Sequence, residues 1–225
     1  MHIRQEASFK QKIAETEMMA LRSQMNPHFI FNSLNSIENF MMKNEKRLAS
    51  SYLNKFARLI RMILDSSRNE LVPLSKDIEA LRLYVDLEQL RFNHKFCFKL
   101  DVDPILLNGD YKVPALLIQP YVENAIVHGL AHSERDDLNL AVTATLEEDY
   151  IHYSIEDNGI GRRLSSLYNQ QNKAHHKSVG LAITEERINI FNRKQNANGR
   201  VTITDLFDEN NKSSGTKVDI LIKAI

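Results

Sequence analysis

Apolar residues recur at helical spacing through the first part of the chain. One stripe consists of Phe31, Leu34, Ile37 and Met41, and a later one of Leu53, Phe56, Leu59, Ile60 and Ile63. A looser stripe precedes both, at Ile13, Met18, Leu21 and Met25. Spacings of three and four residues place side chains on one face of a helix. The pattern therefore predicts long amphipathic helices.

Short polar or proline-containing segments separate these predicted helices. Asn44-Glu45-Lys46 is the expected break between the two long ones, and Val72-Pro73-Leu74 ends the second, because proline disfavours helical conformation in the residue before it. Ser75 is then expected to be the N-cap of a third helix that runs through Arg91. Two long amphipathic helices joined by a short turn cannot bury both apolar faces alone. Pairing of two such hairpins into a four-helix bundle, and hence a homodimer, is predicted.

The second half of the chain has a different pattern. All seven glycines lie from Gly109 onward, and glycine is used in turns and ligand loops rather than inside helices. Alternating apolar positions predict strands at 138–146, 150–155, 200–206 and 217–222, with helices at 114–129 and 180–193. This order predicts an α+β fold: a helical hairpin followed by an α/β sandwich, with helices on one face of a mixed sheet. The polar stretch 161–179 is expected to be a functional loop, such as a lid.

Composition excludes several classes of protein. Of the 225 residues, 43% are apolar and 26% charged, and 29 basic residues balance 29 acidic ones, so no net charge favours nucleic acid. No apolar run approaches the ~18 residues of a spanning helix. A soluble, cytoplasmic chain is expected, attached to a membrane only through another part of a longer parent. Cys97, the single cysteine, is expected to be a buried small apolar residue in a reducing compartment.

Polar residues with candidate chemistry lie in the segment Gln119-Pro-Tyr-Val-Glu-Asn-Ala-Ile-Val-His-Gly129. Asn124 and His128 are one turn apart in the predicted helix, so both can face one ligand, with Glu123 beside them. An amide oxygen suits Mg²⁺, a hard cation that keeps most of its waters and binds next to phosphates. The alternative is a polar helix face that ends at a glycine cap, Gly129.

A second segment, Asp157-Asn158-Gly159-Ile160-Gly161, follows a predicted strand and places Asp157 at the end of that strand. A carboxylate there can accept a hydrogen bond from the exocyclic amine of adenine. Gly159 and Gly161 would let the backbone approach the purine closely. The same residues are also typical of a hairpin turn, which is the alternative interpretation.

Two further segments complete the pattern. Ser178-Val179-Gly180-Leu181 opens a helix, whose free N–H groups can bind phosphate. Gly215-Thr216 precedes the last predicted strand, where an ordinary β-turn is the alternative. The chain has no Gly-x-x-x-x-Gly-Lys-Ser/Thr segment, which excludes a P-loop enzyme.

His28 stands next to Pro27 within the first long stripe. Proline inside a helix costs about 3 kcal/mol and frees a carbonyl one turn back. Asn26 could instead cap a helix that starts here, but apolar periodicity on both sides favours a kinked helix. Gln24 and Asn32 lie four residues to either side of His28, which places three polar groups on one face. An exposed imidazole flanked by amides is a suitable phosphoryl acceptor.

Taken together and in this order, the four segments of residues 95–225 resemble the ATP-binding domain of the GHKL superfamily (gyrase, chaperone, histidine kinase and mismatch-repair ATPases). The resemblance implies that Asn124 holds Mg²⁺ and that Asp157 binds the adenine of ATP. The positions that match the glycine boxes are Gly159, Gly161, Gly180, Gly215 and Thr216. The second box departs from many relatives, which have glycine where this chain has Ser178.

The first half resembles the phosphoacceptor segment of LytS/YehU-type sensor histidine kinases over residues 21–37, and the similarity continues through Tyr84, Glu88 and Arg91-Phe92. It implies a dimerisation and phosphoacceptor region at 1–92 and an ATP-binding domain at 93–225. It further implies autophosphorylation of His28, with Glu123 orienting a metal-bound water or assisting proton transfer and His128 contacting phosphate or a metal-bound water. The phosphoryl group would pass to the receiver domain of a response regulator, with a LytTR-type DNA-binding output.

Two other functions are compatible with the residues. One is a dimeric GHKL scaffold that binds ATP without kinase activity. The other is a GHKL kinase that acts on a serine of a partner, as anti-sigma factors do. The segment Asn26-Pro27-His28-Phe29-Ile30-Phe31-Asn32 argues against the serine kinase, which needs no acceptor histidine.

Overall fold

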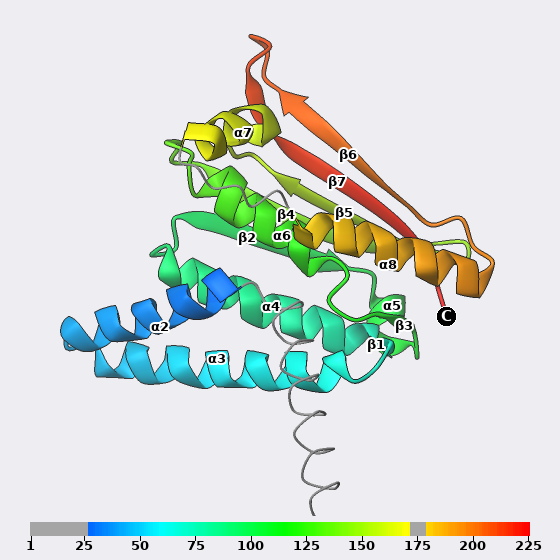
Figure 1. Cartoon of the computed structure of the whole chain (residues 1–225), viewed down its shortest axis with the longest axis horizontal. Coiled ribbons are helices and arrows are strands. Elements are labelled where there is room, and N and C mark those ends of the chain that lie inside the picture. Colours follow the sequence, from blue (N-terminus) through cyan, green and yellow to red (C-terminus); the bar gives the residue numbers. More distant parts are fainter. Residues whose placement is uncertain (1–26, 172–178) are drawn as a thin grey trace, which may run out of the picture. The chain divides into compact units, whose positions relative to one another are not determined.

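The structure is a computed structural model that describes residues 27–171 and 179–225 (Figure 1). The chain divides into two compact units, Met1–Glu70 and Leu71–Ile225. The division lies upstream of the 92/93 boundary expected from the sequence, because the helix after residue 73 is grouped with the sheet. None of the described helices is long and apolar enough to cross a membrane.

The first unit is a hairpin of helices α2 (Pro27–Met42) and α3 (Lys46–Ser67). The predicted break at residues 44–46 is confirmed, and Asn44 turns the chain with a positive φ of 61°, which asparagine tolerates better than most residues. Tyr52, fully buried, donates a hydrogen bond to Ser33 Oγ at 3.3 Å and packs at a tilt against Phe40, with ring centroids 5.9 Å apart. These contacts hold the two helices together.

The apolar stripe predicted for α2 faces outward in the described chain. Phe31, Leu34 and Met41 are 66%, 50% and 64% exposed. Contacts with α3 come instead from the opposite side of α2, where Phe29 and Phe40 are buried. The hairpin thus has an apolar face that its own helices do not cover.

The second unit is an α/β sandwich, which confirms the predicted α+β class. Its elements in chain order are β1 (Leu71–Pro73), α4 (Leu74–Arg91), β2 (Phe96–Val102), α5 (Pro104–Asn108), β3 (Lys112–Pro114), α6 (Gln119–Asn124), the π-helix η1 (Ala125–Leu130), β4 (Leu138–Glu147), β5 (Tyr150–Asp157), α7 (Gly161–Gln171), α8 (Val179–Gln195), β6 (Arg200–Phe207) and β7 (Ser213–Lys223). The main sheet has the order β2-β4-β5-β7-β6, in which only the β2–β4 pair is parallel. Strands β1 and β3 form a separate antiparallel pair.

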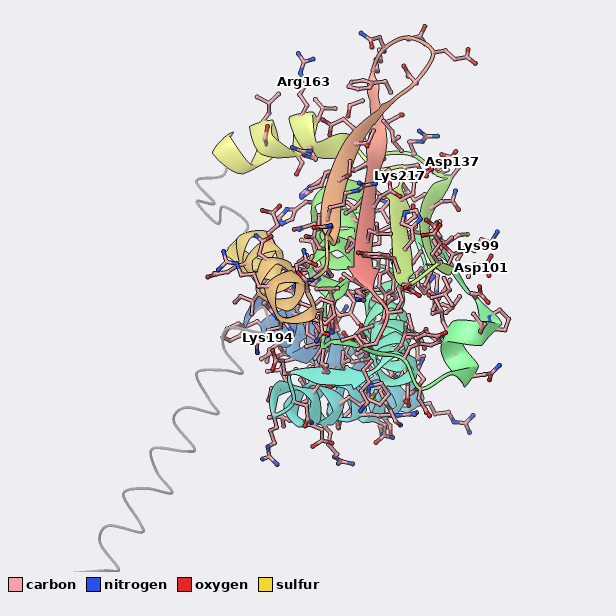
Figure 2. All side chains as sticks on the ribbon, turned by 90° about the vertical axis from the view of Figure 1, so that its right-hand side faces the viewer. Lys99, Asp101, Asp137, Arg163, Lys194 and Lys217 are labelled. Carbon is pink, nitrogen blue, oxygen red and sulfur yellow. The ribbon has the colours of Figure 1, made fainter. Side chains whose placement is uncertain are left out.

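One face of the main sheet is covered by helices. Helix η1 contacts β4, β5 and β7, while α7 and α8 contact β7. Alternate residues such as Val142, Ile155 and Val218 are buried, whereas their neighbours Ser154 and Asp219 are partly exposed. Charged side chains stand on the strands, for example Lys99 and Asp101 on β2 and Lys217 on β7 (Figure 2). The sheet therefore has one apolar and one polar face, as its sequence alternation predicts.

Two predicted helix starts are wrong. The helix expected from residue 114 begins at Gln119, because Pro114 ends strand β3 and Leu116 adopts a left-handed φ of 55° that interrupts any helix. Helix α4 begins at Leu74, so Ser75 lies inside its first turn, and no side chain caps it.

Two further predictions are also corrected. Residues 161–171, expected to be part of a loop, form helix α7, and residues 172–178 lie outside the described residues. Cys97 is exposed rather than buried, because β2 is an edge strand and Cys97 points away from its buried face.

Candidate functional site

Strand β5 places Asp157 at its carboxyl end, where the side chain is almost completely buried. Its Oδ1 accepts a hydrogen bond from the backbone N–H of Gly159 at 2.9 Å. Burial raises the pKa of Asp157 to about 6, although the hydrogen bond from Gly159 opposes the rise. A buried carboxylate with one oxygen held by the following turn is an oriented acceptor.

The turn after β5 packs directly on the end of helix η1. A methyl group on Gly159 would lie 2.3 Å from the carbonyl carbon of Gly129, and one on Gly129 would lie 2.8 Å from Asp157 Oδ1. The N–H of Ile160 donates to the carbonyl oxygen of Gly129 at 3.2 Å. Only glycine leaves room for this approach, so the helix end and the Asp157 turn form one surface.

The first residues of β7 border the same surface on its other side. Thr216 pairs with Asp157 in the β5–β7 register. Gly215 has a φ of 145°, and a methyl group on it would lie 2.0 Å from the carbonyl oxygen of Asp157. Gly161, with a φ of 72°, abuts the side chain of Ser213. Four predicted site residues, Gly159, Gly161, Gly215 and Thr216, thus meet around Asp157.

The segment with Glu123, Asn124 and His128 forms α6 and η1. Glu123, Asn124 and His128 are partly exposed, whereas Ala125 and Ile126 between them are buried, so the three polar residues share the open side of the helix. The hydrogen bonding changes to the π pattern after Asn124, as in the bond from Ala131 N–H to Ile126 O at 2.9 Å. π-helical turns inside helices occur frequently at functional sites.

Glu123 lies close enough to Glu88 of α4 for their charges to interact. Burial raises the pKa of Glu88, the guanidinium of Arg91 opposes this, and the negative charge of Glu123 adds to the rise. Arg91 Nε donates to Glu88 Oε2 at 3.1 Å and its guanidinium stacks 4.3 Å from the Phe92 ring. Glu88, which with Arg91 and Phe92 is part of the family resemblance, therefore lies near the helix of Asn124.

The second glycine box can be described only in part. Gly180 lies in the first turn of α8, where a helix N-terminus presents free N–H groups. Ser178 lies outside the described residues.

His28 is in the first turn of α2 and is exposed. Asn32 Nδ2 lies 3.1 Å from His28 Nδ1 and 3.3 Å from Nε2, so the amide expected beside the imidazole is there. The amide can donate only to a ring nitrogen that carries no proton. Gln24 and the expected kink before Pro27 lie outside the described residues.

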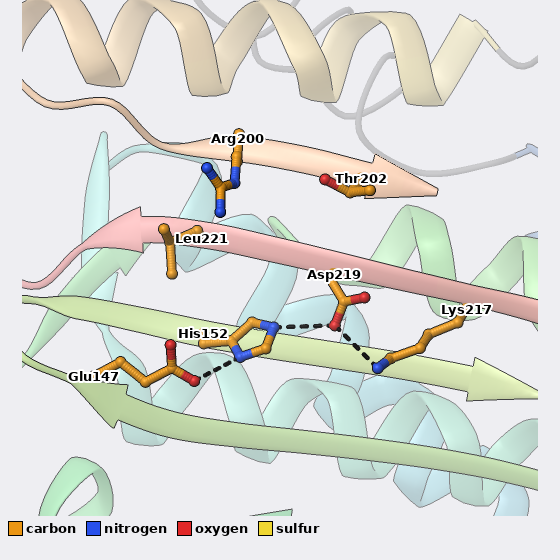
Figure 3. A pocket seen from close by; sticks show the side chains of 7 residues that line it. All are labelled: Glu147, His152, Arg200, Thr202, Lys217, Asp219 and Leu221. Carbon is orange, nitrogen blue, oxygen red and sulfur yellow. Dashed lines mark hydrogen bonds and ion pairs between the residues drawn. The ribbon is translucent and has the colours of Figure 1, made fainter. Parts of the chain in front are cut away.

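A hollow of about 400 Å³ lies on the polar face of the sheet, away from all these residues (Figure 3). His152 bridges Glu147 at 2.8 Å and Asp219 at 3.0 Å, and Lys217 lies 3.6 Å from Asp219. These four side chains of the hollow thus pair with one another across β4, β5 and β7. We interpret this cluster as cross-strand stabilisation and not as the site of chemistry.

Sequence reasoning missed two parts of the site. The sequence indicates only a helix cap at Gly129, although this residue contacts Asp157 and Gly159. Asn158 has no predicted role, yet its Oδ1 accepts the N–H of Asn139 at 2.7 Å and its Nδ2 donates to the carbonyl oxygen of Asp137 at 2.7 Å. Asparagine is a frequent side chain in such turns, which was the available signal.

Solved structures with a similar arrangement include two histidine kinases. The mycobacterial sensor histidine kinase MprB matches 69% of this chain and 97% of its own, at 16% identity and a TM-score of 0.45. The histidine kinase AdeS of Acinetobacter baumannii matches 93% of this chain and 96% of its own, at 15% identity and a TM-score of 0.45.

Sequence comparison gives closer relatives. Sensor protein LytS of Staphylococcus epidermidis is 27% identical over 94% of this chain and 34% of its own length. LytS of Enterococcus faecalis is 31% identical over 79% of this chain and 30% of its own length. LytS of Bacillus subtilis is 32% identical over 69% of this chain and 26% of its own length. The chain thus spans about a third of these relatives. Residues 16–96 match the histidine kinase family. The chain belongs to the histidine kinase family, among the LytS-type sensor kinases.

Proposed function

We propose that this chain is the kinase core of a sensor histidine kinase, which binds ATP with Mg²⁺ and transfers the γ-phosphoryl group to His28. The observation that carries the proposal is the close packing of Gly129, Gly159, Gly161 and Gly215 around Asp157, whose buried carboxylate contacts Gly129. This packing fixes the direction of a carboxylate acceptor, which suits a base with an exocyclic amine. Adenine has such an amine, and guanine does not offer one at that position.

Asn124 is the residue proposed to hold Mg²⁺. Among the residues of the described ranges, no group of three or more His, Cys, Asp or Glu side chains could hold a metal ion. A single amide oxygen next to the nucleotide fits a cation that takes its other ligands from phosphates and water. When bound, Mg²⁺ would offset charge on the transferring phosphoryl group. His128, on the same open side of the helix, would contact phosphate or a metal-bound water.

His28 is proposed to act as the nucleophile through its unprotonated ring nitrogen. Attack on phosphorus requires the neutral imidazole. The Asn32 amide lies beside both ring nitrogens and would hold the ring in place, and it must release the unprotonated nitrogen before that nitrogen attacks. The nitrogen–phosphorus bond forms as the bond to the β-phosphate oxygen breaks, and ADP leaves. Glu123 would orient a metal-bound water or assist proton transfer.

The partners follow from the same proposal. The exposed stripe of Phe31, Leu34 and Met41 would pair with a second copy of the chain in a four-helix bundle. Phosphohistidine would then donate its phosphoryl group to the receiver domain of a response regulator. A LytTR-type output is proposed for that regulator. Attachment to a membrane through another part of a longer parent stays a prediction.

Labelling with γ-³²P ATP tests the proposal. The wild-type chain should gain acid-labile label, and His28→Gln and Asn124→Ala should not. His152→Gln is the matched control, because it removes an imidazole from the polar face of the sheet and should label normally. Nucleotide binding by the wild type without label would contradict the kinase and support the scaffold. Acid-stable label on an added partner would indicate a serine kinase.

A further inference from the structure

The side chains of Asp77 and Arg187 bind the backbone at Ala115 and Leu116, a few residues before helix α6 begins. This arrangement is called the clamp below. Leu116 has a left-handed φ of 55°, which costs a leucine roughly 1–2 kcal/mol and must be held by its surroundings. Its N–H donates to Oδ1 of Asp77 at 2.7 Å. The preceding carbonyl, of Ala115, accepts from Nη2 of Arg187 at 2.7 Å. Asp77, Ala115 and Leu116 are all buried.

The clamp joins three helices that are distant in the sequence. Asp77 belongs to the first turn of α4, Arg187 belongs to α8, and the clamped residues lead into α6 at Gln119. The two side chains also attract each other electrostatically, and the pKa of Asp77 is nevertheless raised to about 6 by its burial. The carboxylate and the guanidinium bind the N–H and the C=O of one peptide group, the one that joins Ala115 to Leu116, and so fix its position and its orientation.

Helices α6 and α8, both joined by this clamp, each carry residues of the proposed nucleotide site. Helix α6 carries Glu123 and Asn124 a few residues after Leu116. Helix α8 carries Gly180 in its first turn, about two turns before Arg187. A shift of the clamp would therefore move the metal-binding amide relative to the second glycine box.

We infer that Asp77 and Arg187 are positioning residues for the nucleotide site, which hold residues 115 and 116 so that α6 and α8 keep a fixed spacing. This inference rests on the proposed function for its effect on ATP. The competing explanation is a core ion pair that supports the fold of the whole unit and has no specific bearing on the site.

Binding of MgATP to four variants separates the two explanations. Asp77→Ala and Arg187→Met should each raise the Kd of MgATP about tenfold or more, as displacement of a binding group by about 1 Å does. The double variant should bind MgATP no more weakly than the weaker-binding of the two single variants, because both residues hold the same peptide group. Asp77→Asn, which keeps an oxygen for the Leu116 N–H, should bind better than Asp77→Ala.

Ile151→Ala is the control for lost stability. Ile151 is fully buried at the opposite end of β5 from Asp157, so its truncation should destabilise the unit with less than about a twofold change in Kd. If the wild type binds MgATP and the clamp variants bind it equally well, the inference is wrong. It is also wrong if Ile151→Ala weakens binding as much as they do.

Hydrogen exchange without nucleotide decides the inference independently of ATP. In Asp77→Ala, amides of residues 115–130 and of the first turns of α8 should exchange at least about tenfold faster than in Ile151→Ala. An equal increase across all strands and helices of the unit would overturn the positioning role. Failure of the wild type to bind ATP would contradict the proposed function, and the exchange pattern would still support or overturn the clamp.

Discussion

Gly129 and Asp157 are in such close contact that a methyl group on Gly129 would lie 2.8 Å from Asp157 Oδ1. Gly129 is the residue before the end of η1, in the helical segment that carries Asn124 and His128, whereas Asp157 ends strand β5. The direction of the carboxylate therefore depends on where that helix ends. The proposed adenine acceptor and the proposed metal-binding amide are parts of one packed surface.

Gly129→Ala should displace the Asp157 carboxylate and weaken MgATP binding about tenfold or more, because the new methyl group would lie 2.8 Å from Oδ1, closer than van der Waals contact allows. Isothermal titration measures this directly. Gly199→Ala is a matched control, since its methyl group would lie 2.6 Å from Asn192 Oδ1, at the start of β6 and outside the site. Equal weakening by both variants would show that general strain, and not the carboxylate, sets the affinity.

The affinity of the wild type for MgATP should fall as the pH drops below about 6. Burial raises the pKa of Asp157 to about 6, and only the ionised carboxylate accepts through both oxygens, from the Gly159 N–H at Oδ1 and from the adenine amine at the other oxygen. The phosphates of ATP titrate in the same range, so Asp157→Asn provides the reference. The wild type should lose more affinity than Asp157→Asn between pH 7.5 and 5, and parallel pH profiles would contradict the role of the carboxylate.

Ionisation of Asp157 should lower the stability of the fold, although it should strengthen the binding of MgATP. The folded-state pKa is raised from 3.8 to about 6, so the folded chain binds the proton more tightly than the unfolded chain does. The associated stability is present at pH 4 and lost as the pH rises through 6. Asp157→Asn should therefore increase the free energy of unfolding at pH 7.5, by up to about 3 kcal/mol, while ATP binding weakens. Urea titrations of both proteins at pH 5 and 7.5 test this, and a lower free energy of unfolding for Asp157→Asn than for the wild type at pH 7.5 would contradict it.

The parts of the fold that the sequence predicted are those with local signals. Alternation alone placed β4, β5, β6 and β7 to within a few residues, and the turn at Asn44 followed from a polar break. The helix start at Gln119 could not be predicted, because the conformation of Leu116 depends on Asp77, which lies 39 residues away. Arg187 holds Ala115 across 72 residues.

The candidate site also combines features that have a local sequence signal with features that depend on distant residues. Each motif could be recognised by itself, since Asp157 ends a strand and Asn124 lies on a helix. The contact of Gly129 with Gly159 joins two motifs that are thirty residues apart and leaves no local pattern in either. Packing of this kind is specified by the whole fold, which is why the glycine before the end of η1 resembled an ordinary helix cap.

Asn32→Ala should slow autophosphorylation of His28 about fivefold, because a hydrogen bond of this kind contributes about 1 kcal/mol to the orientation of the ring. Asn32→Asp should slow it further, since a carboxylate accepts and would favour the protonated imidazole. Single-turnover labelling at saturating ATP measures the rate. The Kd of MgATP should not change, and a change in Kd without a change in rate would count against the proposed contact.

Phe31→Glu combined with Leu34→Glu should convert the proposed homodimer to a monomer. Both side chains are at least half exposed in the hairpin, and charges buried in an apolar interface without partners cost several kcal/mol each. The dimer dissociation constant should rise about a hundredfold or more, which light scattering over a concentration series measures. Asn39→Glu adds a charge at an exposed polar position of α2 and should leave the dimer intact. Because Phe31 and Leu34 do not contribute to the contacts of Phe29 and Phe40 with α3, the helix content of the double variant should match that of the wild type. A dimer that persists in the double variant would mean that another surface pairs the chains.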